Sequence, residues 1–187
     1  MSLTLALYQR LMGLAHGLAP QVLQNRVTRG KEDAERYAER LGLTHMPRPE
    51  GSLVWFHGVS VGESLSILPI IALMAQKRPD LKVLVTTATT TSADILAKRL
   101  PDGAIHQYAP VDTPQALTAF LDHWKPDLAV FIESDIWPNQ LRELTRRRIP
   151  HVLLSARITA KTYRGWRRFK SSVSSLLKGY SLIMAQD

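Results

Sequence analysis

Short apolar runs alternate with helical patterns from residue 53 to residue 187, and this alternation limits the possible folds more than any other feature. The runs expected to form strands are Leu53–Phe56, Val83–Val85, Ile105–Tyr108, Leu128–Ile132, Val152–Leu154 and Leu182–Ala185. The helices expected between them are Ser64–Gln76, Ser92–Leu100, Pro114–Trp124, Pro138–Arg148 and Ala160–Lys178. The runs do not alternate apolar with polar residues, as is typical of strands covered on both faces. The pattern predicts an α/β fold, a parallel sheet with helices on both faces.

The first fifty residues follow a different pattern. Five leucines recur at helical spacing, namely Leu3, Leu7, Leu11, Leu14 and Leu18. They predict an amphipathic helix, whose leucine face lies either on a membrane or on the chain's own domain. The same stretch contains Arg10, His16 and Pro20, so it is not expected to span a membrane. A second helix is expected over Glu32–Leu41, ended by Gly42 and followed by a linker at residues 45–52.

Composition narrows the chemistry. The chain has no cysteine, which excludes disulfides, thiolate metal sites and cysteine nucleophiles. Its formal net charge is +8, and the stretch from Arg142 to Lys178 contains eleven basic residues against one acid, Glu143. Such a stretch is either a solvated helix face or a surface for an anionic partner, which could be nucleic acid, a membrane or a phosphorylated substrate.

Polar residues gather where the predicted strands end. They occupy residues 57–63, 86–91, 133–139 and 155–157. Because ligands of open parallel sheets bind beyond the carboxyl ends of the strands, these segments are the expected site. Glu63 and Glu133 each come soon after an apolar strand, and we expect them to share a cleft. The threonines of residues 86–91 are equally typical of helix caps, and Thr91–Asp94 is close to a capping box. Thr113 followed by Pro114 likewise predicts a cap and the first residue of the next helix.

The segment from Gly58 to Gly62 has three interpretations. It is not a phosphate-binding P-loop, because the lysine of that motif is missing and Glu63 would repel phosphate. It matches the G-x-S-x-G motif of serine hydrolases, with Ser60 as nucleophile and Asp127 and His151 as its partners. In the third interpretation the glycines form a tight turn that presents Glu63 on the first turn of a helix.

Several motifs together resemble the 3-deoxy-D-manno-octulosonic acid (Kdo) transferases. They are residues 57–63 (HGVSVGE), 86–91 (TTATTT), 108–112, 133–139 (ESDIWPN) and 155–157 (SAR), with residues 29–31 and 39–42 upstream. The resemblance covers nearly the whole chain. It departs from the family at Asp135, where a longer glutamate is usual. It implies the Rossmann-like N-terminal half of a GT-B glycosyltransferase, with a helical membrane-associating segment at residues 1–45 and an acceptor-binding domain at residues 52–187.

The resemblance also implies an activity. It is the transfer of Kdo from CMP-Kdo to a glucosamine hydroxyl of a tetra-acylated, bis-phosphorylated lipid A precursor, with inversion and without a metal or other cofactor. Glu63 would be the general base. Glu133 would orient the acceptor or Glu63, or would stabilise the positive charge that develops on the donor sugar. The residues expected to bind substrate are His57, Ser60, Gly62, Thr87, Thr89, Asp135, Asn139 and Arg157.

Location and partners follow from the same resemblance. The protein is expected on the cytoplasmic face of the bacterial inner membrane, bound peripherally to its anionic surface, with no nucleic-acid partner. The family continues with a second domain that binds the donor, so the 187-residue chain is expected to be nearly inactive alone.

Overall fold

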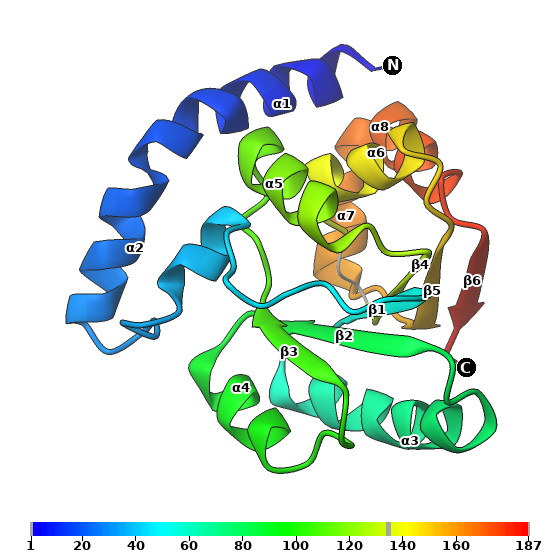
Figure 1. The fold of residues 1–187 in the computed structure, drawn as a ribbon. Helices are drawn as coiled ribbons and strands as arrows, with labels where there is room; N and C mark the ends of the chain where they lie inside the picture. Colours follow the sequence, from blue (N-terminus) through cyan, green and yellow to red (C-terminus); the bar gives the residue numbers. More distant parts are fainter. Residues whose placement is uncertain (1, 134–135, 187) are drawn as a thin grey trace.

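The computed structural model describes residues 2–133 and 136–186, and these form one parallel sheet between two layers of helices (Figure 1). The strands are β1 (Leu53–His57), β2 (Lys82–Thr87), β3 (Ile105–Tyr108), β4 (Leu128–Ile132), β5 (His151–Ala156) and β6 (Leu182–Ala185). Their order is β3-β2-β1-β4-β5-β6, and every neighbouring pair is parallel. The predicted fold class is confirmed, with each strand where an apolar run predicted it.

Helices cover both faces of the sheet, which explains why the strands are apolar throughout. Helices α3 (Val61–Lys77) and α4 (Thr90–Ala97) lie below the sheet in Figure 1, and α5 (Pro114–Trp124), α6 (Pro138–Arg146) and α8 (Lys170–Leu177) lie above it. Strand β1 sends Trp55 into one core, and Val54 and Phe56 into the other. Because successive strand residues point to opposite faces, both sets must be apolar when both faces are covered.

The N-terminal segment forms an arc along the outside of the molecule. Helix α1 (Leu3–Ala15) continues through a 3₁₀ turn, η1 (His16–Leu18), into α2 (Ala19–Thr28), and Figure 1 shows this arc passing over α5. Leu5 is the one residue of α1 that is buried. The predicted leucine stripe faces outward, and no helix in the described part of the chain is long and apolar enough to cross a membrane.

Two predicted helices were wrong in extent. In place of Glu32–Leu41 there are turns and a short 3₁₀ helix, η2 (Tyr37–Leu41). The carboxylate of Asp33 accepts hydrogen bonds from the backbone N–H groups of Glu35 and Arg36 in the pattern of an N-cap, so the turns start after Asp33 and not at Glu32. The expected helix Ala160–Lys178 is divided into α7 (Ala160–Trp166), a 3₁₀ turn η3 (Arg167–Phe169) and α8.

The helix caps were predicted in part. Thr113 caps α5 and Pro114 opens it, as expected. Thr89 caps α4 by accepting from the Ser92 N–H, where the sequence favoured a cap starting at Thr91.

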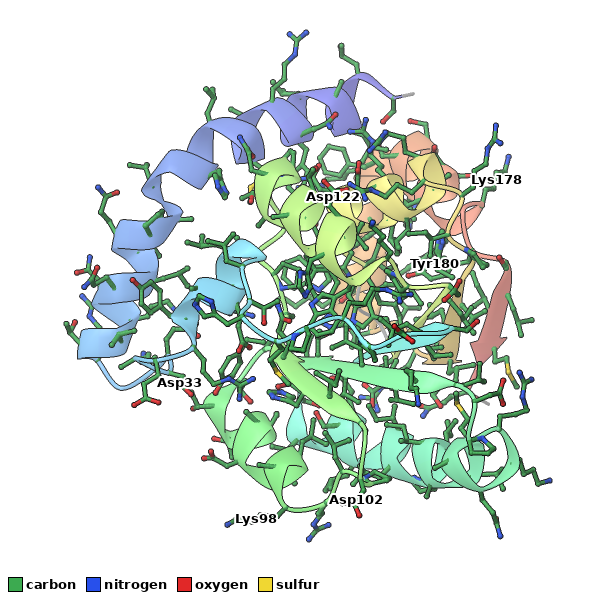
Figure 2. The ribbon with its side chains drawn as sticks, viewed as in Figure 1. Asp33, Lys98, Asp102, Asp122, Lys178 and Tyr180 are labelled. Carbon is green, nitrogen blue, oxygen red and sulfur yellow. The ribbon has the colours of Figure 1, made fainter. Side chains whose placement is uncertain are left out.

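On the upper layer the Asp122 carboxylate of α5, labelled in Figure 2, accepts from the Arg147 guanidinium at 2.6 Å and ties α5 to the end of α6.

Candidate active site

A cavity of about 220 Å³ lies at the carboxyl edge of the sheet, and we call it the rim cavity. The carboxyl ends of four strands and the segments after them contribute to it: His57 at the end of β1 and Val59 after it, Ala88 after β2, Asp112 after β3, and Trp137 and Gln140 after β4. Met12 of α1 and Arg40 of η2 also line it. Strands β1 and β4 are adjacent but lead to opposite sides of the sheet, which is the position where open α/β sheets bind ligands.

Glu63 is held beside Val59, a residue that lines this cavity, by the turn that precedes α3. Ser60 caps the helix, its hydroxyl accepting from the Glu63 N–H at 3.2 Å. The Glu63 carboxylate turns back and accepts from the Val59 N–H at 2.9 Å. A Cβ atom at Gly58 would stand 3.2 Å from the Glu63 Cβ, so the glycine leaves room for this return. The structure therefore agrees with the third interpretation of the glycine segment, in which a turn presents Glu63 on the first turn of a helix.

Glu133 occupies a bend that joins the ends of two strands. Its φ is +60°, an uncommon value for a residue other than glycine. Its N–H donates to the Leu154 carbonyl at 2.9 Å, and its carbonyl accepts from the Arg157 N–H at 3.3 Å. Glu63 and Glu133 thus follow the adjacent strands β1 and β4, but neither of them lines the rim cavity. Asp135 lies outside the described residues.

His57 lies at the inner wall of the cavity as a neutral imidazole. Its Nδ1 is 2.8 Å from the Thr86 hydroxyl, which also accepts from the Trp55 indole N–H at 2.8 Å. Burial, together with the nearby positive charge of Arg40, lowers the pKa of His57 to about 4. His57 is therefore uncharged near neutral pH and is a hydrogen-bonding group there.

Asp112 is a buried carboxylate that caps a helix far away in the sequence. Its Oδ1 accepts from the Gln140 N–H at 2.9 Å, and its Oδ2 accepts from the Asn139 N–H at 3.1 Å and from the Tyr8 hydroxyl at 2.9 Å. Burial raises the pKa of Asp112 to about 6, although these hydrogen bonds act in the opposite direction. The N-cap residue Trp137 has no side-chain oxygen for the first turn of α6, so Asp112 supplies it.

Sequence reasoning did not select Asp112 as a site residue, although a signal was present. A helix that starts Trp-Pro-Asn lacks the usual serine, threonine or aspartate at its N-cap, so its N–H groups need an acceptor from elsewhere. Arg40, Trp137 and Gln140 were missed as well. The signal for Arg40 and Trp137 was that residues 39–42 and 133–139 belong to segments that resemble the family, and Gln140 directly follows the second of these segments.

The predicted substrate-binding residues do not gather in the rim cavity. Among those that the structure describes, His57 is the one that lines the rim cavity. Thr87 is buried against His106, and Thr89 caps α4. Asn139 is buried with its amide donating to the Asp112 carbonyl at 2.7 Å. The remaining three, Ser60, Gly62 and Arg157, are exposed on segments that follow β1 and β5.

The serine hydrolase interpretation fails on geometry. Ser60 follows the carboxyl end of β1, whereas Asp127 accepts from the Leu53 N–H at the amino end of that strand. His151 is the first residue of β5, also at an amino end, and its Nδ1 is 3.0 Å from the Ile149 carbonyl. A catalytic triad needs direct hydrogen bonds between its members, so these three residues cannot form one.

A family model described as 3-deoxy-D-manno-octulosonic-acid transferase (kdotransferase) matches residues 35–187, which include all the predicted site residues. The chain belongs to the Kdo transferase family. Relatives designated 3-deoxy-D-manno-octulosonic acid transferases show the extent of the likeness. The mitochondrial protein of Arabidopsis thaliana is 37% identical over 98% of this chain, that of Rickettsia bellii 35% over 84%, and that of Haemophilus influenzae 31% over 82%.

The chain spans well under half the length of these Kdo transferases, covering 42%, 38% and 36% of them respectively. Two solved structures resemble it with a TM-score of 0.50. They are a UDP-N-acetylglucosamine 2-epimerase from Listeria monocytogenes, 8% identical, and MurG from Acinetobacter baumannii, 7% identical. They cover 73% and 71% of this chain, and it covers 40% of each. At such identity the likeness shows the fold alone, and it agrees with the Rossmann-like fold expected from the sequence.

Proposed function

We propose that this chain is the acceptor-side domain of a GT-B glycosyltransferase that transfers Kdo from CMP-Kdo to a lipid A precursor with inversion. Family membership supports the sugar that is transferred. The observation that carries the catalytic proposal is the bond between Glu63 and Val59. This bond holds the Glu63 carboxylate beside Val59, which lines the rim cavity at the ligand-binding position of the sheet.

Glu63 is proposed as the general base because an alcohol attacks poorly while it keeps its proton. A carboxylate that is positioned beside the acceptor hydroxyl can take this proton during attack, which typically contributes about 10²–10⁴-fold to the rate. Glu133 is proposed to orient the acceptor from the neighbouring strand end. The strained backbone of Glu133 supports this role, because such conformations cluster at functional sites.

The donor is proposed to bind mainly outside residues 1–187. In this proposal a second domain supplies the CMP-Kdo site. The proposal is supported by the lengths of the relatives, because this chain spans less than half of each of them. The 187-residue chain alone is therefore expected to show little transfer.

We also propose that residues 1–45 and α7–η3 rest on the anionic cytoplasmic face of a bacterial inner membrane. The exposed leucines of α1 and η1 support this proposal, as do the exposed cations on α7 and η3, among them Arg164, Arg167 and Arg168. The two regions meet in an apolar groove of about 260 Å³, lined by Leu5 and Tyr8 of α1 and by Trp166 and Phe169. Acyl chains of the acceptor would enter this groove.

The test is Glu63→Ala in an enzyme that joins this chain to a donor domain. We expect the transfer of labelled Kdo from CMP-Kdo to a tetra-acylated lipid A precursor to fall by about 10²–10⁴-fold, with an unchanged circular dichroism spectrum. Glu50→Ala, which removes an exposed acid before β1, is the control and should transfer at the wild-type rate. Wild-type turnover by Glu63→Ala would refute the assignment of the base.

A further inference from the structure

Arg40 is a largely buried cation at the wall of the rim cavity, with 14% of its side chain exposed. It comes from η2, and two hydrogen bonds fix it beside the segment after β3. Its Nη1 donates to the Ala109 carbonyl at 2.6 Å, and its own carbonyl accepts from the Val111 N–H at 2.8 Å. Within the described residues, Ala109 is the only hydrogen-bond acceptor of this guanidinium.

The acid nearest to Arg40 is shared with another arginine. Glu32 is buried, and its Oε1 accepts from the Arg26 Nε at 2.9 Å. Its Oε2 is 3.7 Å from the Arg40 Nε, which is too far for a hydrogen bond. Burial lowers the pKa of Arg40, and this effect exceeds the raising effect of Glu32. One carboxylate thus serves two cations, and Arg40 has the poorer contact.

The other described side chains that line the cavity do not hydrogen-bond the Arg40 guanidinium. Asp112 faces the same cavity, but it already accepts three hydrogen bonds, from Tyr8 and from two N–H groups of α6. His57 is neutral near pH 7. Gln140 also lines the cavity, and its buried Nε2 has no acceptor among the described residues. Buried charges and donors are costly unless they are paired, and among the described residues the Arg40 Nε and the Gln140 Nε2 have no hydrogen-bond acceptor.

We propose that the rim cavity binds an oxyanion, a phosphate monoester or a carboxylate, through the Arg40 guanidinium. The planar fork of donors on arginine matches the geometry of both groups. The inference rests on the proposed function for its source: the oxyanion is then either a phosphate of the acceptor or the carboxylate of the acidic sugar. Arg40 is the residue that would select an anionic partner at this edge of the sheet.

The experiment titrates the ¹⁵N-labelled chain with methyl phosphate and, separately, with acetate, against sodium chloride at equal ionic strength. The readout is the indole N–H resonance of Trp137, which lines the cavity, with Trp166 on α7 as the internal reference. We expect saturable shifts of Trp137 and not of Trp166. A stronger response to methyl phosphate assigns the subsite to a phosphate, and a stronger response to acetate assigns it to a carboxylate.

Variants connect binding to the charge. Arg40→Gln should weaken the binding by about tenfold or more, because a hydrogen-bonded charge is lost, whereas Arg99→Gln removes an exposed charge and should bind as wild type does. If Arg40→Gln does not fold, Ala88→Glu places an acid in the cavity lining and should abolish the binding while keeping Arg40.

Absence of saturable shifts in the wild-type chain, or wild-type affinity in both Arg40→Gln and Ala88→Glu, would overturn the proposal. Because the assay needs no transfer, failure of the subsite is distinguished from failure of the proposed activity, which the Glu63→Ala test measures.

Discussion

Helices α1 and α5 are both amphipathic, yet they use their apolar residues in opposite ways. Helix α5 turns its stripe into the core and fully buries Leu117, Phe120, Leu121 and Trp124. Helix α1 buries Leu5 and leaves Leu3 and Leu14 exposed by 86% and 79%. Apolar residues at helical spacing are therefore buried in one helix and exposed in the other. The reason is that α5 lies between the sheet and α1, whereas α1 forms the outer surface (Figure 1).

The two helices are also held by different forces. Helix α5 is fixed by apolar burial, at about 25 cal/mol for each Å² removed from water. The α1–η1 segment is attached to the start of α5 mainly by polar bonds: Tyr8 donates to Asp112, His16 is 2.8 Å from the Thr113 hydroxyl, and Gln115 donates to the Gly13 carbonyl. The comparison teaches that the leucines of α5 contribute to folding through burial, while the outer leucines of α1 stay exposed and contribute little to it.

The largest effect on stability is expected in α5. Phe120→Ala removes a fully buried ring that packs 4.8 Å from the Trp55 ring, centre to centre, and should reduce the free energy of unfolding by about 3–5 kcal/mol. Urea denaturation measures this loss. Leu11→Ala on the outer face of α1 is the matched control and should change the free energy of unfolding by less than about 0.5 kcal/mol. Similar losses in the two variants would break the comparison.

An intermediate effect is expected at Asp112, where the two helices meet. Because the folded-state pKa of Asp112 is raised to about 6, the stabilisation from this group is complete below its ordinary pKa of 3.8 and is lost as the pH rises through 6. The free energy of unfolding of the wild type, relative to Asp112→Asn, should thus fall by at most about 3 kcal/mol between pH 4 and pH 7.

Urea denaturation of both proteins across this pH range tests the prediction. Subtracting the Asp112→Asn values removes the titration of other groups, including His57, whose pKa is lowered. A difference that is constant or increases with pH would contradict the raised pKa.

The smallest effect on stability is expected from the outer leucines. In the triple variant Leu7→Ser, Leu11→Ser, Leu14→Ser, the free energy of unfolding should stay within about 1 kcal/mol of the wild-type value, because these side chains are exposed in the folded protein. Sedimentation with vesicles of anionic lipid should show a large loss of binding, because apolar area drives such association. Unchanged vesicle binding would indicate that the stripe serves another partner.

Much of the fold could be predicted because it depends on local patterns. Every strand followed from an apolar run, and the start of α5 followed from Thr113 and Pro114. The helix expected at Glu32–Leu41 was wrong in extent, because Asp33 caps the turns that follow it and only Tyr37–Leu41 forms a 3₁₀ helix. At the site, Glu63 was predicted together with its helix turn, whereas Arg40 and Asp112 were not, since their significance comes from neighbours distant in the chain.

The sequence by itself determined the layers of the molecule, because strand and helix periods and covered faces are properties of neighbouring residues. Only the tertiary structure decided which surface the leucines of α1 face, and that the carboxylate at position 112 caps a helix that begins at position 138. The physical reason is that these contacts join residues that are far apart in the sequence. The bond from Tyr8 to Asp112 joins residues 104 positions apart, and no local pattern records a contact that forms only when the whole sheet is assembled.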